Sequence, residues 1–374
     1  MTQFTIVIRP DEAAMIEKIA IDVLNKLTTP SDDFGDFVGI GTHLKAMYSI
    51  LCLESEEVRM VGILGPSGIG KTTIARALFS KLSSQFHHRA SVAYKRINQD
   101  DFGMKLSWEG QFLSQILGQD IKVEKLGVVE QRLKRKKVLI ILDDVDDLEL
   151  LKPLVGHTGW FGSGSRIIVI TQDRQLLKAH QINLVYEVEF PSPDIAKEIF
   201  YQYAFGQNSP PDGFTELAVE VAKLAGNLPL GLSVLGSSLR GRGKAEWMNM
   251  LPRLRNDLYG KIEDTLKVSY NRLQREDREL FLYIAFAFLF NGEQVSYIKD
   301  LLGDSVNIGL TMLTDKSLIR ITPDETVEMH NLLQKLGREI VRAESIDIPG
   351  KRRFLVDAEE ISDVFADNTV SLLA

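Results

Sequence analysis

Short apolar runs alternate with stretches of helical spacing over roughly the first half of the chain. Val138 to Leu142 and Arg166 to Thr171 are apolar almost throughout, as expected of strands buried on both faces of a sheet. Val58 to Leu64 is a similar strand, and Val185 to Phe190 is a weaker, alternating one. Helical spacing separates them, as from Ile74 to Leu82. Strands alternating with helices predict a parallel α/β sheet.

The second half has a different pattern, in which helical spacing dominates after Pro191. From about Ile262 several helices precede two short strands, Leu318 to Thr322 and Thr326 to Met329, and a further helix follows them. Helices with a two-stranded wing, turning at Pro323-Asp324-Glu325, predict a winged-helix fold.

The N-terminal region predicts a strand and a helix. Phe4, Ile6 and Ile8 alternate like a short strand, and apolar residues then recur at helical steps as far as Leu27. This helix either packs on the rest of the chain or belongs to an upstream domain.

Composition excludes several classes of protein. The 374 residues are 44% hydrophobic and 25% charged, which is ordinary for a soluble globular protein of two or three domains. The net charge of −7 gives no general attraction to nucleic acid or anionic lipid, and the basic cluster Arg132 to Lys137 is interpreted as a solvated helix end. The single cysteine, Cys52, excludes an internal disulfide. No run is long enough to span a membrane, and Leu280 to Phe290 is interpreted as a buried helix.

The stretch Gly65 to Thr73 (GPSGIGKTT) matches the phosphate-binding P-loop pattern. A predicted strand precedes it and a predicted helix follows it, which is the context that this motif needs. Its backbone N–H groups and Lys71 can neutralise a di- or triphosphate, and Thr72 offers a hydroxyl to Mg²⁺. The residues predicted to contact the nucleotide here are Gly68, Ile69, Gly70, Lys71, Thr72 and Thr73.

Polar side chains follow two of the predicted buried strands. Asp143 and Asp144 follow the first, where Asp143 would reach Mg²⁺ and Asp144 would polarise an attacking water. The alternative is a pair of turn aspartates, of which Asp146 and Asp147 are further examples. Thr171 ends the second strand and would sense a γ-phosphate, although a polar strand end explains it equally well.

Two later motifs carry little weight by themselves. Gly226-Asn227-Leu228-Pro229-Leu230 interrupts a helical pattern and is typical of a helix boundary. Met329-His330-Asn331 lies where the second wing strand meets a helix, and a lone histidine is more often structural than a ligand contact.

Taken in order, these motifs resemble the NB-ARC module of plant intracellular immune receptors of the NLR family, and the TIR-associated subclass fits best. The resemblance extends from about Phe37 to Asn368. It rests on Gly65 to Thr73, Val138 to Val145, Gly164 to Thr171, Gly226 to Leu230 and Met329-His330-Asn331, with Trp160 to Arg166 and Pro349 to Leu355 pointing to the TIR class.

The resemblance implies an α/β P-loop NTPase domain followed by a small helical domain and a winged-helix domain. The expected boundaries are a linker helix at 1–34, the nucleotide-binding domain at 35–190, the helical domain at 191–261, the winged-helix domain at 262–345 and a C-terminal linker at 346–374.

The family implies a switch that is closed with ADP and active with ATP, and that Mg²⁺-dependent ATP hydrolysis resets slowly. Lys71 and Asp144 would be its catalytic residues, and Thr72 and Asp143 would hold Mg²⁺. Val38, Gly39 and Ile40 match the segment that contacts adenine in this family. Pro229 matches the proline that packs on adenine, and His330 matches the histidine that contacts the β-phosphate.

Two residues depart from the family pattern. Asn331 replaces the usual aspartate, and Gln172 replaces a sensor arginine that many relatives carry. The chain has neither the TIR domain, which carries the NADase activity of the family, nor the leucine-rich repeats that usually recognise the pathogen ligand. We therefore expect no NADase activity.

The expected partners are the nucleotide, further copies of the chain in a ring, and other NLR receptors. The expected location is the cytoplasm, with the nucleus as an alternative. Three other functions stay open: a STAND- or AAA-type ATPase with steady turnover, an adaptor or decoy that does not cycle, and a DNA-binding regulator. The acidic net charge counts against the last of these.

Overall fold

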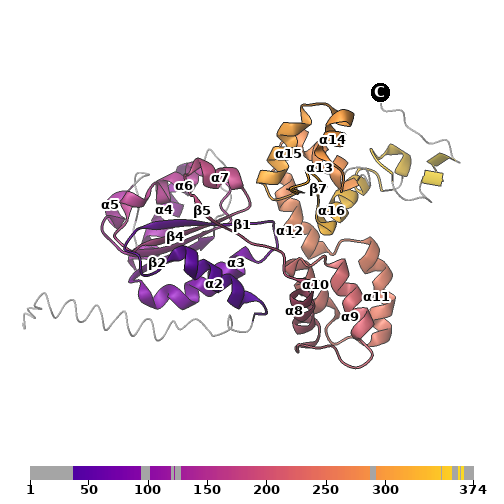
Figure 1. Ribbon diagram of the computed structural model, residues 1–374, viewed down its shortest axis with the longest axis horizontal. Coiled ribbons are helices and arrows are strands. Elements are labelled where there is room, and N and C mark those ends of the chain that lie inside the picture. The colour runs from indigo at the N-terminus through magenta and orange to yellow at the C-terminus, as the bar shows by residue number, and fades with distance from the viewer. Residues whose placement is uncertain are drawn as a thin grey trace, which may run out of the picture. The chain divides into compact units, whose positions relative to one another are not determined.

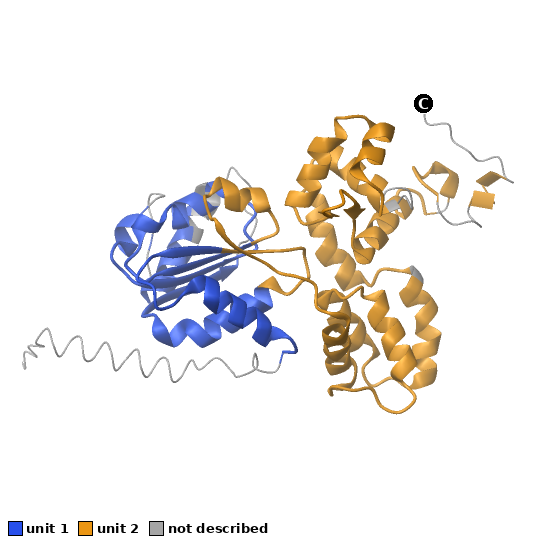
Figure 2. Cartoon of the chain, in the orientation of Figure 1, with its two compact units in different colours: residues 1–61, 72–170 blue, residues 62–71, 171–374 orange. Residues whose placement is uncertain are grey.

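The structure is a computed structural model that describes residues 37–93, 102–118, 122, 128–286, 292–346, 348–355, 361–362 and 364–365. The strand and helix expected before residue 35 lie outside the described residues. The chain divides into two compact units, one of residues 1–61 and 72–170 and one of residues 62–71 and 171–374 (Figure 2).

A five-stranded sheet has the strand order β2-β3-β4-β1-β5 (Figure 1). Its strands are β1 (Arg59–Leu64), β2 (His88–Ala93), β3 (Val138–Asp143), β4 (Arg166–Thr171) and β5 (Leu184–Glu187). β3 runs parallel to β2 and to β4. The predicted α/β fold is confirmed, and β3 and β4 agree with the apolar runs because both are almost fully buried.

Strand β2 has no counterpart among the predicted strands, although it pairs with β3 along its whole length. Only Ala90 of its six residues is buried. A half-exposed strand needs no continuous apolar run, so its sequence lacks the signal that identified β3 and β4. β5 was expected at Val185 to Phe190 but is shorter, ending at Glu187.

Helices of the first unit pack their apolar side chains into its core. They are α2 (Ile40–Leu51), α3 (Lys71–Leu82, whose first residue falls in the second unit), α4 (Phe102–Leu117), α5 (Val129–Leu133) and α6 (Leu148–Val155). Met47 and Leu51 of α2 and Leu78 of α3 are fully buried. The Asp147 carboxylate caps α6 by accepting the backbone N–H of Glu149 at 2.8 Å.

The second unit contains α7 (Arg174–Ala179) and, later in the chain, a helical group around one aromatic cluster. The helices of this group are α8 (Pro193–Phe205), α9 (Thr215–Leu224), α10 (Pro229–Leu239) and α11 (Lys244–Asn256). Trp247 of α11 is buried against Phe200, Phe205 and Phe214. Its indole N–H donates to the Leu239 carbonyl at 3.1 Å, so the ring is buried with its polar atom paired.

The rest of the second unit is a set of helices with a two-stranded wing. The elements are α12 (Gly260–Asn271), α13 (Arg275–Phe286), α14 (Val295–Leu302), α15 (Val306–Asp315), β6 (Arg320–Ile321), β7 (Val327–Glu328) and α16 (Asn331–Arg342). β6 and β7 are antiparallel, as expected of a wing, but shorter than predicted. A winged-helix fold is therefore confirmed. Among the described residues, no helix is both long and apolar enough to cross a bilayer.

Candidate nucleotide-binding site

The P-loop segment of the second unit has a backbone that favours glycine. Gly68 has a φ of +80°, in the left-handed region. A Cβ at this position would lie 2.7 Å from the Cβ of Leu230, which is closer than carbon atoms approach. Glycine is therefore required at position 68 for two reasons, the conformation of the turn and the close contact with the start of α10.

The Lys71 side chain is hydrogen-bonded to the backbone of the P-loop. Its Nζ donates to the carbonyl oxygens of Gly65 at 2.7 Å and Pro66 at 2.8 Å. The residue is only 8% exposed. A buried ammonium bonded to loop carbonyls places a positive charge where the motif needs one for phosphate.

Thr72 and Asp143 meet in the first unit, as the sequence predicted. The Thr72 hydroxyl donates to Asp143 Oδ1 at 3.2 Å. A hydroxyl and a carboxylate at this separation are the hard oxygen donors that suit Mg²⁺, with phosphate oxygens and water completing the coordination. Both residue types and their contact therefore fit the metal.

Asp144 follows at the end of β3 with a φ of +56°. Aspartate tolerates this left-handed conformation better than most residues, and such conformations concentrate at functional sites. With this φ, the Asp144 side chain leaves the backbone in a different direction from a side chain in an extended strand.

The predicted adenine-contacting segment lies in the same unit. Val38 and Gly39 come immediately before Ile40, the first residue of α2.

Thr171 is the last residue of β4 and is 1% exposed. In the second unit its Oγ1 accepts the backbone N–H of Asp173 at 3.0 Å. The Asp173 carboxylate in turn caps α7, accepting the N–H groups of Gln175 at 2.8 Å and Leu176 at 3.3 Å. Thr171 therefore helps to shape the turn after β4, beyond ending the strand.

The Gly226–Leu230 segment forms a helix boundary and also contacts the P-loop. Gly226 and Asn227 have φ values of +60° and +61°, and Pro229 begins α10. The backbone N–H of Leu230 donates to the Gly68 carbonyl at 3.0 Å. This bond places the start of α10, with Pro229, beside the P-loop.

His330 connects the winged-helix region to that same turn. Its Nδ1 accepts the N–H of Leu332 at 3.2 Å and caps α16, so Nε2 carries the proton and donates to the Gly226 carbonyl at 2.7 Å. Burial lowers the pKa of His330, which favours this neutral form. The ring stacks on Phe190, with centroids 5.1 Å apart.

The second unit thus brings together three sequence motifs around a narrow cavity. Its lining includes Pro66 and Ser67 of the P-loop, Phe190, Leu228 and His330. Phe190 was missed as a site residue, because the predicted strand accounted for it fully.

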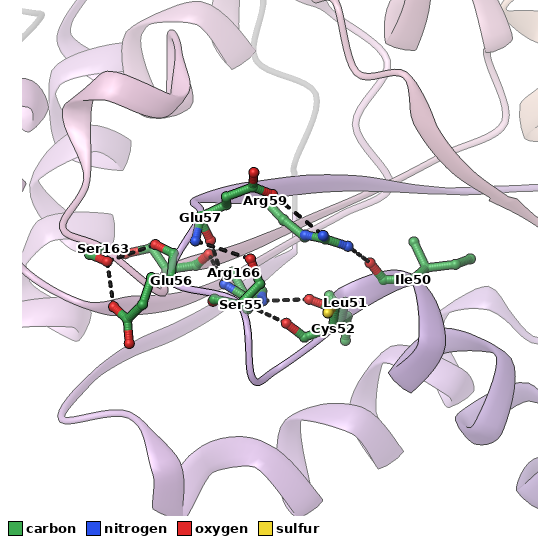
Figure 3. Close-up of polar contacts among 10 residues, drawn as sticks. Ile50, Leu51, Cys52, Ser55, Glu56, Glu57, Arg59, Ser163 and Arg166 are labelled. Atoms are coloured by element: carbon green, nitrogen blue, oxygen red, sulfur yellow. Dashed lines mark hydrogen bonds and ion pairs between the residues drawn. The ribbon is translucent and has the colours of Figure 1, made fainter.

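Arg166 was also missed, because an arginine at the start of an apolar run resembles a strand edge. The side chain is fully buried in the first unit. Its guanidinium donates to five backbone carbonyls, those of Leu51, Cys52, Ser55, Glu57 and Ser165 (Figure 3). Two of these acceptors, Leu51 and Cys52, end α2, where a cation is favourable. Arg166 thereby fastens the connection that leads from α2 into β1 and the P-loop.

Comparison with known proteins agrees with this geometry. The NB-ARC domain model matches residues 41–210, and the model of the winged-helix domain of Roq1-like disease resistance proteins matches residues 274–345. The chain belongs to the NB-ARC family of plant disease resistance proteins. The resemblance drawn from the ordered motifs is confirmed.

Highly similar relatives come from Arabidopsis thaliana. The protein SUPPRESSOR OF npr1-1, CONSTITUTIVE 1 is 67% identical over 363 residues, and disease resistance proteins RPP4 and RPP5 are each 65% identical. Each match covers 96% of this chain but only 25%, 31% and 25% of the respective relative. The chain therefore spans about a quarter to a third of the length of these proteins.

Among solved structures, the Walker-type ATPase PABY2304 of Pyrococcus abyssi has a TM-score of 0.57 and 14% identity. The match covers 81% of this chain and 97% of that protein. At this identity the likeness concerns the fold alone, and it agrees with a P-loop NTPase architecture.

Proposed function

We propose that this NB-ARC chain is the ADP- and ATP-binding switch of a plant disease resistance protein, acting in defence signalling. The observation that carries the proposal is the hydrogen bond from the Leu230 N–H to the Gly68 carbonyl. Through it the helical region contacts the P-loop, and through Gly226 the winged-helix region contacts the same turn. A ligand at the P-loop would therefore affect the attachment of both regions.

The roles of the phosphate-binding residues follow from their chemistry. The backbone N–H groups from Gly68 to Thr73 and the Lys71 ammonium would neutralise the phosphates. Thr72 and Asp143 would hold Mg²⁺, which supplies charge neutralisation at the phosphates when bound. Thr72 follows Lys71 directly in the chain, so the two can serve one ligand.

The remaining residues would distinguish the two nucleotides and reset the switch. Val38, Gly39, Ile40 and Pro229 would contact adenine, and Thr171 would contact the γ-phosphate. His330 would stabilise the ADP-bound closed form, since its ring already bridges the winged-helix region and the Gly226 carbonyl. Asp144 would orient the attacking water for slow hydrolysis.

Single-turnover ATP hydrolysis with matched variants tests these roles. Asp144→Asn should retain MgATP binding but hydrolyse bound ATP at least about tenfold more slowly, whereas Asp143→Asn should weaken the dependence of binding on Mg²⁺. Equal hydrolysis by Asp144→Asn and the parent would remove Asp144 from the mechanism. Rapid multiple turnover by the parent would favour the steady ATPase instead of the switch.

The proposal extends to partners and location. ATP-bound chains would assemble with one another or with longer disease resistance proteins in the cytoplasm, the nucleus being the alternative. Size-exclusion chromatography with ADP and with a non-hydrolysable ATP analogue tests assembly, which should appear only with the analogue. A chain that binds longer receptors equally well without any nucleotide would be an adaptor.

A further inference from the structure

A partly buried ion pair joins the turn after β4 to the end of α15. Lys316 Nζ lies 2.9 Å from Asp173 Oδ2. The two side chains are 23% and 21% exposed, far less than those of most ion pairs that the structure describes. Water therefore screens this pair less than a surface pair, and its geometry is that of a charge-assisted hydrogen bond.

Asp173 is also bonded to the predicted γ-phosphate sensor. Its backbone N–H donates to Thr171 Oγ1 at 3.0 Å, while its Oδ1 caps α7. One residue thus contacts Thr171 through its main chain and Lys316 through its side chain. Thr171 and Lys316 are therefore connected through this one residue.

Further hydrogen bonds lie on both sides of the ion pair. Ser317 Oγ donates to the Gln172 carbonyl at 3.1 Å, and Ser269 Oγ of α12 donates to Gln172 Oε1 at 2.7 Å. Gln175 Nε2 donates to Asp315 Oδ2 at 2.7 Å. The segment from Gln172 to Gln175 is therefore attached to the winged-helix region at several positions.

The Lys316–Asp173 pair differs from these contacts because both of its groups are charged and lie within hydrogen-bonding distance of each other. A second pair, Lys178 and Asp315, is wider at 3.9 Å, and its lysine side chain is 60% exposed. Charge-assisted hydrogen bonds are about twice as strong as neutral ones, and removing Lys316 or Asp173 leaves a partly buried charge behind. Burial and the nearby Glu276 carboxylate raise the pKa of Asp277 on α13, and the Lys316 ammonium opposes this increase. Lys316 is thus placed between two carboxylates, of which Asp173 is the one in hydrogen-bonding contact.

We propose that Asp173 and Lys316 form an ionic latch, which holds the winged-helix region on the turn after Thr171 and slows the release of bound nucleotide. The inference rests on the proposed function and adds a regulatory contact to the same site. Opening of the latch permits the winged-helix region to leave this turn, so the latch controls exchange without touching the nucleotide.

The test is a double-mutant cycle on the release rate of a fluorescent ADP analogue, chased with excess ATP. Lys316→Met removes the cation, and Asp173→Asn removes the anion while keeping an oxygen to cap α7. Each single variant should release the analogue about tenfold faster, within the range typical of coupling between sites. The double variant should release it no faster than the faster single variant.

A matched control is the pair formed by Lys197 and Asp194 on α8, 3.1 Å apart with side chains 40% and 88% exposed. Lys197→Met should leave release unchanged, because so exposed a pair contributes little. Added salt should speed release from the parent more than from Lys316→Met, which reports the ion pair without comparing the stability of variants.

Single variants that release the analogue at the parent rate, or effects that multiply in the double variant, would overturn the latch. Failure of the parent to bind any nucleotide would overturn the proposed function and the exchange role together. In that case the same cycle, measured by urea unfolding, would still distinguish a coupled pair from two independent charges.

Discussion

Gly226→Ala should destabilise the chain more than an ordinary glycine substitution at positive φ. At Gly226 the φ of +60° alone costs alanine about 1–2 kcal/mol. The new Cβ would also lie 2.2 Å from Asn331 Oδ1 and within 2.8 Å of two further atoms of that side chain. The Asn331 amide must then move, although it donates to the Leu224 carbonyl at 3.4 Å.

Two hydrogen bonds are at risk in this variant, that from Asn331 to Leu224 and that from His330 to the Gly226 carbonyl. At about 1 kcal/mol each, they bring the expected loss in the free energy of unfolding to about 3–4 kcal/mol. Gly241→Ala is the matched control, since Gly241 has a φ of +77° and a Cβ added there would meet no atom within 4 Å. It should lose only the backbone cost, about 1–2 kcal/mol.

Urea unfolding of both variants measures the difference. The double variant Gly226→Ala/Asn331→Ala removes the side-chain atoms that would clash, so its loss should be smaller than the sum of the two single losses by about 1 kcal/mol or more. Equal losses of unfolding free energy for Gly226→Ala and Gly241→Ala, or strict additivity in the double variant, would refute the close contact between Asn331 and this turn.

Three further predictions concern the P-loop, the buried histidine and the buried arginine. Lys71→Ala should purify without nucleotide and lose about 4 kcal/mol of ligand-derived stability at a thousandfold excess over Kd; full ADP occupancy with unchanged melting would contradict this. Burial lowers the pKa of His330 below 6.5. The contribution of His330 to the free energy of unfolding should therefore be complete above pH 6.5 and decrease as the pH falls below it. His330→Gln should remove part of that decrease in urea titrations at several pH values, with His43, whose pKa burial also lowers, supplying a further part. Arg166→Met should lose about 3 kcal/mol or more by urea unfolding, because it leaves buried carbonyls unpaired, and Arg166→Lys should recover only part; a loss under about 1 kcal/mol would contradict the anchoring role.

Much of the fold could be predicted because its central strands are buried on both faces. β4 has the predicted bounds, and β3 extends the predicted run by one residue to Asp143. β2 could not be found, since a half-exposed strand with mixed residues resembles a loop. The wing was predicted at the correct position in the chain. Its strands are only two residues long, because only Arg320 and Ile321 pair with Glu328 and Val327.

The candidate site, like the fold, could be predicted only in part from the sequence. The P-loop and the contact of Thr72 with Asp143 could be predicted, because a local motif and the end of an apolar strand determine them. The partners of His330 could not, because its bond to Gly226 joins residues more than a hundred positions apart. The hydrogen-bond partner of Asn331 could not be predicted either. Its side-chain amide donates to the Leu224 carbonyl at the end of α9, so this residue acts through a hydrogen bond instead of a charge.

The central claim is that this chain binds an adenine nucleotide at the P-loop. The most direct measurement is the nucleotide that co-purifies with the chain, released by denaturation and quantified by chromatography. Near-stoichiometric ADP is the predicted result, since the P-loop, the Gly226–Leu230 turn and His330 are already joined. Folded protein that carries no nucleotide, and takes up neither ADP nor ATP when they are added, would contradict the account.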